Sequence, residues 1–357
     1  MKKFLQILSA CLGPALLFLT AAFPAAAETT LNADEYGSVS AAFDAIPQDA
    51  GSVTILLPGK LSAEQDADIR IPEDRGITEI RLLPDPVSEK AVLDSVTRIC
   101  ANGIPLTIGK GIRMENASIY GGACVSGTEA SLPSSSLKVG GEVGFVFGGG
   151  LAENGGYSAV TETNVTIDEG SLVFYEVFGG GHAFGNGSRV FTELAAASVM
   201  GTVDYVLGAG YAESGGTSEC VRTAVTVGET GSVAVALFGG GSAADEGSLS
   251  SVGNTFTQLS GSAHWAFPGD FAFAGGETRL DHAGRLEILA SGSASEAYLG
   301  SFSSDPGSRA FMNTAELMNC GTAEDVIRRS QSADGGEATT QVTAVFPCKE
   351  NETPAAD

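Results

Sequence analysis

An interval close to 30 residues recurs along about half of the chain. A Gly-Ser or Gly-Thr step returns at residues 170, 201, 231, 261 and 292, with Gly141 one interval earlier, so the spacings are 29, 31, 30, 30 and 31. Each step is followed by an apolar residue that opens a glycine run, such as FGGG from Phe178, and then by a polar turn with its own glycine. Three marks that keep one register over six copies predict a repeat architecture, regular over residues 141–313.

The repeat favours strands over helices. Segments such as NVTI, ending at Ile167, and AVTV, ending at Val227, alternate apolar and other residues with period two. Paired helices would instead carry frequent glycines, at about 1 kcal/mol each. Glycine runs permit positive φ and close backbone approach, so coils can bend alike and stack at about 4.8 Å. The sequence therefore predicts an all-β fold, a parallel β-helix (β-solenoid) with coils of about 30 residues.

The first 27 residues have the layout of a secretory signal peptide. Lys2 and Lys3 precede an apolar run that ends in an alanine triplet, which predicts cleavage between Ala27 and Glu28. The segment LSAC, ending at Cys11, leaves a lipoprotein cleavage site as an alternative. No later stretch has about 18 uninterrupted apolar residues, so no transmembrane segment is expected in the mature chain. The predicted location is secreted, extracellular or at the cell surface.

Residues 28–140 are expected to form an N-terminal cap and the first coils. Val39, Ala42 and Phe43 share one face at helical spacing, Ser38 is a candidate N-cap, and Pro47 ends the pattern, which predicts a short capping helix. Period-two strands follow it. At the other end the glycine marks fade after Asn313, so residues 314–357 are predicted to be a C-terminal cap and tail.

Two resemblances accompany these patterns. The order of a short helix, a buried strand and a Pro-Gly exit, over Tyr36 to about Asp85, resembles the entry of right-handed parallel β-helix proteins of the pectin-lyase-like class. That class includes polysaccharide lyases, hydrolases, adhesins and inert shafts. The unit TNVTIDEGSLVFYEVFGGGHA, residues 163–183, is similar to the VTI and VFGGG units of large secreted bacterial surface proteins with solenoid folds. The likeness implies a right-handed helix and a surface role.

The charge balance excludes one class of partner. The chain has 43 acidic and 19 basic residues and a formal charge of -24, so its surface repels phosphate backbones. Nucleic acid is therefore not expected as a partner. A glycan or a host or cell-surface protein is expected instead.

Five cysteines follow the predicted signal peptide. Cys100 and Cys124 are 24 residues apart, about one short coil, so they are candidates for a disulfide between neighbouring layers. Cys320 and Cys348 are candidates for a second disulfide that closes the C-terminal cap. Cys220 is left over and is interpreted as a buried thiol that packs as a small apolar side chain. No CxxC pair occurs and the three histidines lie far apart, so no metal or other cofactor is expected.

The best group of titratable residues is the segment TRLDHAGRLE, residues 278–287, which supplies Asp281, His282, Arg285 and Glu287 as weak catalytic candidates. Cleavage of polysaccharides on a β-helix needs several titratable groups that converge on one groove. The register aligns this segment with residues 251–258, which carry no charge. A solvated edge of a terminal coil is therefore the favoured interpretation, and a catalytic site the alternative.

Threonine forms one further pattern. Thr163, Thr192, Thr223 and Thr255 fall at similar phase in successive coils. A ladder of surface hydroxyls could bind a regular surface, as on ice-binding solenoids, whereas threonine also favours strands and stacks on itself. The second interpretation is preferred.

Together these patterns predict a non-catalytic β-solenoid that presents a surface for adhesion or recognition. A polysaccharide-active β-helix enzyme, a lyase or hydrolase, is the alternative, and whether the chain is an enzyme stays open. The stacking model also predicts that Gly180→Val destabilises the fold more than Ser188→Val.

Overall fold

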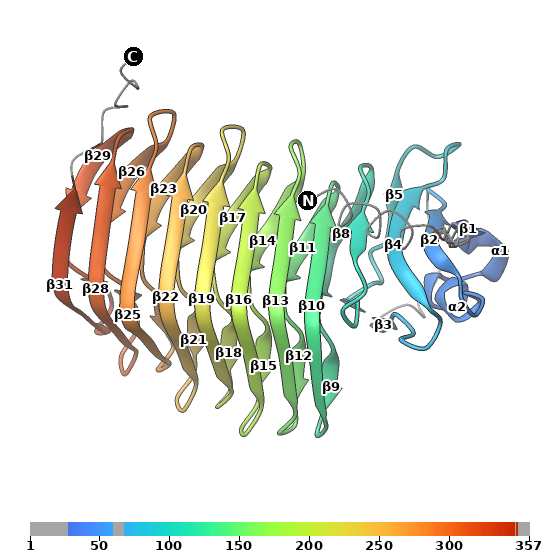
Figure 1. Cartoon of the computed structure of the whole chain (residues 1–357), viewed down its shortest axis with the longest axis horizontal. Coiled ribbons are helices and arrows are strands. Elements are labelled where there is room, and N and C mark those ends of the chain that lie inside the picture. The colour runs from blue at the N-terminus through green and yellow to red at the C-terminus, as the bar shows by residue number, and fades with distance from the viewer. Residues whose placement is uncertain (1–27, 60–67, 347, 349–357) are drawn as a thin grey trace, which may run out of the picture.

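The computed structural model describes residues 28–59, 68–346 and 348, and it confirms the predicted all-β parallel solenoid (Figure 1). About ten coils stack along one axis. Within the described residues the strands form sheets of 12, 11 and 8 strands, which we call the long, middle and short sheets. Each coil contributes in turn to the long, middle and short sheet, and all listed pairs are parallel. The predicted signal peptide and its cleavage site at Ala27 lie outside or at the border of the described residues.

The long sheet contains β1 (Glu28–Asn32), β2 (Gly51–Leu57), β4 (Ile77–Pro84), β7 (Leu106–Ile108), β10 (Glu129–Val139), β13 (Tyr157–Ile167), β16 (Arg189–Val199), β19 (Thr217–Val227), β22 (Leu249–Leu259), β25 (Glu277–Ile288), β28 (Arg309–Asn319) and β31 (Glu337–Phe346).

The middle sheet contains β3 (Asp68–Arg70), β5 (Ala91–Val92), β6 (Arg98–Cys100), β8 (Ile112–Tyr120), β11 (Glu142–Phe147), β14 (Leu172–Phe178), β17 (Thr202–Leu207), β20 (Ser232–Phe238), β23 (Ser262–Phe267), β26 (Ser293–Tyr298) and β29 (Thr322–Ile327).

The short sheet contains β9 (Cys124–Ser126), β12 (Leu151–Glu153), β15 (His182–Phe184), β18 (Tyr211–Glu213), β21 (Ser242–Ala244), β24 (Phe271–Phe273), β27 (Phe302–Ser303) and β30 (Gln331–Ser332).

Two short helices occupy the N-terminal end of the stack (Figure 1). These are α1 (Ala33–Tyr36) and α2 (Val39–Asp44). The Ser38 hydroxyl accepts a hydrogen bond from the Ala41 amide at 3.0 Å, as an N-cap residue does. Val39, Ala42 and Phe43 are buried in the main core, so the predicted capping helix is confirmed.

The core follows from the period-two pattern of the strands. Val165 and Ile167 of β13 and Val173 and Val177 of β14 point into the stack and are fully buried. Because equivalent positions of every coil do the same, one continuous apolar cluster runs from the capping helix to Leu317. Each coil buries its apolar face only against its neighbours, as in other solenoids.

The turns between the short and long sheets alternate, so the structural repeat is two coils. Asn154-Gly155 and Ser214-Gly215 both have two consecutive residues with positive φ, whereas the turn in the coil between them has its positive φ angles at Gly185 and Gly187. Tyr157 pairs with Arg189 and Arg189 with Thr217, so successive coils advance by 32 and then 28 residues at this edge. This alternation explains why the spacings of the turn glycines in the sequence alternate around 30.

The threonine pattern is internal. Thr163, Thr223 and Thr255 lie in one buried row whose other members include Ser135 and Ala195. Their hydroxyls donate to backbone carbonyls of the glycine corner, at Gly179, Gly239 and Pro268 respectively. Thr192 belongs to another row, opposite Val160 and Cys220. A surface ladder of hydroxyls is therefore wrong for these residues, and the structural interpretation holds.

The sheets continue past Asn313, where the glycine marks were predicted to end. Asn313 lies inside β28, and β29, β30 and β31 extend all three sheets, the long one as far as Phe346. Gly321-Thr322 and Gly335 keep the interval, so the signal was present in the sequence. Among the described residues, none of the helices has the length and apolar character needed to cross a membrane.

Candidate ligand-binding groove

The glycine run of each coil makes a sharp corner between the middle and short sheets. In one coil this corner is Gly179–Gly181, between β14 and β15. The Gly180 amide donates to the Ala209 carbonyl of the next coil at 3.1 Å, and a Cβ placed on Gly180 would lie only 2.7 Å from the Gly210 nitrogen. Side chains are therefore excluded from the corner, and the backbones of successive coils approach closely.

Aromatic side chains fill the outside of this corner. Val177 points into the main core, so the next residue, Phe178, points outward, yet it is almost fully buried. Rings from the two sheets meet there: Phe178 stacks on Tyr211 at 5.5 Å between centroids, and Phe238 on Phe271 at 5.3 Å. Outward side chains of two sheets can touch only if the corner is concave on its outer side. The concave outer corner is a structural groove that runs along the stack.

The stacked rings follow the coil spacing. The ring centroids of Tyr120 and Phe147 lie 4.8 Å apart, as do those of Phe147 and Phe178, and the latter planes differ by 1°. This separation matches the spacing of hydrogen-bonded strands, because each coil contributes one ring at the same register. A second run continues through Phe238, Phe267 and Tyr298.

The N-terminal half of this corner opens into a cavity of about 390 Å³, which we call the aromatic groove. Rings of Tyr120, Phe145, Phe147, Tyr211 and Phe273 line it, together with the polar side chains of Ser118, Glu176, His182 and Glu213. The neighbouring rings of Phe184 and Tyr175 are each 41% exposed. The groove thus combines apolar faces with a few polar groups, the composition typical of small-ligand sites.

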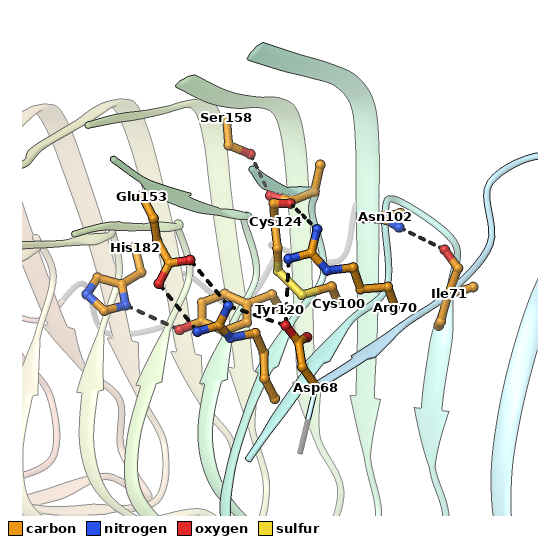
Figure 2. The surroundings of a disulfide bond; sticks show 12 residues. Asp68, Arg70, Ile71, Cys100, Asn102, Tyr120, Cys124, Glu153, Ser158 and His182 are labelled. Carbon is orange, nitrogen blue, oxygen red and sulfur yellow. Dashed lines mark hydrogen bonds and ion pairs between the residues drawn. A yellow bond between two sulfur atoms is a disulfide. The ribbon is translucent and has the colours of Figure 1, made fainter. Parts of the chain in front are cut away.

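A chain of polar contacts crosses the groove. The Tyr120 hydroxyl lies 3.2 Å from His182 Nδ1, as Figure 2 shows. His182 Nε2 lies 3.3 Å from Glu213 Oε2, close enough for an ion pair but without the geometry of a hydrogen bond. His182 also stacks on Tyr211 at 4.9 Å. Its ring is thus held between a phenol, a carboxylate and an aromatic face.

Glu176 and Tyr211 have altered proton affinity in this setting. Partial burial, and then the neighbouring Glu213 carboxylate, raise the pKa of Glu176 to about 7. Burial, followed by the charges of Glu213 and Glu176, raises the pKa of Tyr211 above its ordinary value. At neutral pH the groove therefore contains a carboxyl group that is about half protonated, next to a phenol that stays neutral.

The disulfide closes the N-terminal end of the groove (Figure 2). Cys100 is bonded to Cys124, as predicted, and both are buried in the aromatic cluster with Tyr120. Arg98 contacts both Glu153 carboxylate oxygens at 3.3 Å and lies 3.7 Å from Asp68. This arginine is therefore paired with two carboxylates at the edge of the groove.

The other cysteines agree with the sequence prediction. Cys320 is bonded to Cys348, and the Cys220 thiol is free and buried. Burial raises the pKa of Cys220 to about 12, so the thiol is not ionised at neutral pH. Two disulfides are compatible with an oxidising compartment outside the cell.

The four weak catalytic candidates lie on the outer face of the long sheet. The predicted register is confirmed, since Ser251 pairs with Arg279 and Gln258 with Glu287. Arg285 is 2.6 Å from Glu287 and 3.7 Å from Glu316, so it pairs with carboxylates of its own and the next coil.

Asp281 and His282 are both exposed, where an irregularity in register between Leu280 and Ala283 interrupts the alternation. The Asp281 carboxylate accepts a hydrogen bond from Ser251 at 3.3 Å. None of these four candidates lines the aromatic groove. A search of the described residues finds no group of three or more histidine, cysteine, aspartate or glutamate side chains suited to a metal ion.

Sequence reasoning missed Glu176, Glu213 and the groove rings. His182 was weighed only against the Gly-His-Gly motif of β-helix pectinases. The signal available was positional: His182 and Tyr211 each open a short-sheet strand directly after a glycine run. Two other hollows, of about 560 and 330 Å³, lie at the turns around Gly275 and on the long sheet around Thr163, and neither has an aromatic ring in its lining.

No protein-family model matches this chain, and neither a curated protein nor a solved structure matches it. The finer resemblance to VFGGG-repeat surface proteins is therefore not confirmed, and only the parallel β-solenoid class is shown.

Proposed function

We propose that this protein is a secreted or surface-displayed recognition protein that binds a carbohydrate chain along the aromatic groove without cleaving it. The observation that carries the proposal is the series of partly exposed rings beside carboxylates in one concave corner. Sugar rings present apolar C–H faces that pack on aromatic rings, while their hydroxyls donate hydrogen bonds to carboxylates. A groove that follows the stack suits a linear chain better than a compact ligand.

We expect replacement of one groove ring to weaken this binding. Tyr211→Ala should reduce the affinity for a bound oligosaccharide by about tenfold, because a stacked ring contributes roughly 0.5–1.5 kcal/mol beyond the area it buries. Isothermal titration with neutral, amino and uronic oligosaccharides of increasing length measures the loss. Affinity should grow with chain length, since neighbouring coils offer further contacts.

Two variants serve as controls. Tyr211→Phe keeps the ring and should retain most of the affinity. Tyr157→Ala removes a ring from the long sheet, where Tyr157 lies beside Arg189, and should change nothing. Equal affinities of Tyr211→Ala and the unmodified protein, or no binding of any oligosaccharide, would contradict the proposal.

The enzyme alternative has one specific observation in its favour. Glu176, with its pKa near 7, lines the same groove as Glu213, and glycosidases use a protonated carboxyl group together with a carboxylate. Reducing-end assays on the oligosaccharides that bind distinguish the two functions. We expect no turnover. Turnover that Glu176→Gln abolishes, with binding retained and Asp281→Asn without effect, would replace recognition by catalysis.

A further inference from the structure

The groups that line the aromatic groove favour one sign of ligand charge. Glu176 and Glu213 carry its carboxyl groups, and no lysine or arginine occurs among the described residues that line it. The nearest guanidinium, Arg98, is paired with Glu153 and Asp68. The faces of aromatic rings are also electron-rich, so the rings attract cations as the carboxylates do. The carboxylates and the ring faces therefore both disfavour an anionic chain.

We propose that the groove selects glycans that carry protonated amino groups, such as oligomers of glucosamine, over N-acylated and acidic glycans. This inference rests on the proposed function, because it concerns the ligand of the same groove. An ammonium group bound there would be attracted by Glu176 and Glu213 and by the faces of Tyr211 and Phe273. A uronate would bring a third carboxylate to a site that offers no free cation.

The surroundings of Glu176 add a measurable consequence. The titratable groups that act on it from neighbouring strands are Asp204 and Tyr205 of β17, Glu213 and Tyr211 of β18, and His182 of β15, which lines the same groove. Repulsion by Glu213 contributes to the raised pKa of Glu176, so a bound ammonium group lowers that pKa again. Binding of an amino sugar near neutral pH should therefore release protons from Glu176.

Three tetrasaccharides that differ in charge test the proposal: tetraglucosamine, its N-acetylated form and a tetramer of galacturonate. Isothermal titration near neutral pH and low ionic strength should give an affinity for tetraglucosamine at least about tenfold above that of the N-acetylated form. Galacturonate should not bind. Titration in two buffers of different ionisation enthalpy should show proton release with tetraglucosamine only.

Glu176→Gln should reduce the preference for tetraglucosamine to less than about threefold and abolish the proton release, while leaving the N-acetylated tetramer's affinity unchanged. Glu193→Gln, which removes one exposed carboxylate from the long sheet, controls for the general negative charge of the protein and should keep the full preference. Circular dichroism verifies that both variants fold.

The outcomes separate this inference from the proposed function. Equal binding of the amino and N-acetylated tetramers, or tighter binding of galacturonate, overturns the charge selection and leaves carbohydrate recognition standing. A preference that Glu193→Gln reduces as much as Glu176→Gln also overturns it, because the attraction would then come from the whole surface. No binding of any tetramer overturns both.

Discussion

Gly180→Val should destabilise the protein by about 3 kcal/mol or more, because no side chain fits at the glycine corner. A Cβ on Gly180 would lie 2.7 Å from the Gly210 nitrogen and 3.0 Å from the Ala209 carbonyl carbon, both of them backbone atoms of the next coil. Overpacking of a core against movable side chains already costs about 1–3 kcal/mol, and a backbone held by sheet hydrogen bonds has less freedom to move. The thermal midpoint should fall by roughly 5–10 °C.

Thr202→Val is the matched control, since it introduces the same side chain at an exposed position of the neighbouring coil and should change the midpoint little. Ser188→Val, the contrast predicted from the sequence, is a poor control. Ser188 is 0% exposed, and its hydroxyl accepts a hydrogen bond from the Gly155 amide at 3.1 Å. Its loss would leave a partly buried donor without a partner, at about 1–3 kcal/mol. Thermal midpoints of Gly180→Val and Thr202→Val within 2 °C of one another, roughly the effect of 1 kcal/mol or less, would contradict the stacking model.

The coils were predictable because their glycines have steric causes that recur at a constant interval. Gly141, Gly201 and Gly231 each stand where a Cβ would collide with a carbonyl of the preceding coil. The same logic predicted the capping helix, since Ser38 and the apolar face beside it act locally. The pairing of the cysteines was accessible too, because one coil brings Cys100 next to Cys124.

The groove was not predictable in the same way, because it depends on which side of a strand a residue occupies. Val177 and Phe178 are both apolar, and their pattern does not tell that the first faces the core and the second the outer corner. Glu176 and Glu213 lie on different strands and sheets, and they line one cavity only because the corner is concave. Ser188 likewise appears in sequence as a polar turn residue, and its burial follows from the alternation of turn types.

The motif FPGD, residues 267–270, departs from the glycine run for a structural reason. Asp270 stands where other coils have Gly210 or Gly241, and its side chain points into the stack and is 0% exposed. One carboxylate oxygen accepts a hydrogen bond from the Gly241 amide at 2.9 Å, and the other has no hydrogen-bond partner. A Cβ on Gly240 would coincide with this carboxylate, so the glycines of the preceding coil make room for it.

Asp270 makes the stability of the fold depend on pH. Complete burial raises its pKa to about 7, well above the ordinary value of 3.8, although the Gly241 amide acts in the opposite direction. Below about pH 4 the carboxyl group is protonated in both the folded and the unfolded chain, and it costs nothing. As the pH rises from 4 to 7, the unfolded chain ionises first, so the folded state loses stability, by up to about 4 kcal/mol above pH 7.

Asp270→Asn should therefore stabilise the protein at pH 8 by as much as about 4 kcal/mol and change its stability little at pH 4, because an amide keeps the acceptor for Gly241 and carries no charge. Urea unfolding at both pH values measures the two differences. Asp325→Asn, an exposed aspartate on β29, is the control and should show no such pH dependence. If Asp270→Asn were equally or less stable than the unmodified protein at pH 8, the buried carboxylate would have to be compensated inside the stack. The unpartnered Asp270 oxygen and the buried hydroxyls of Ser250 and Thr278, which also have no hydrogen-bond partner, would then be the first groups to examine.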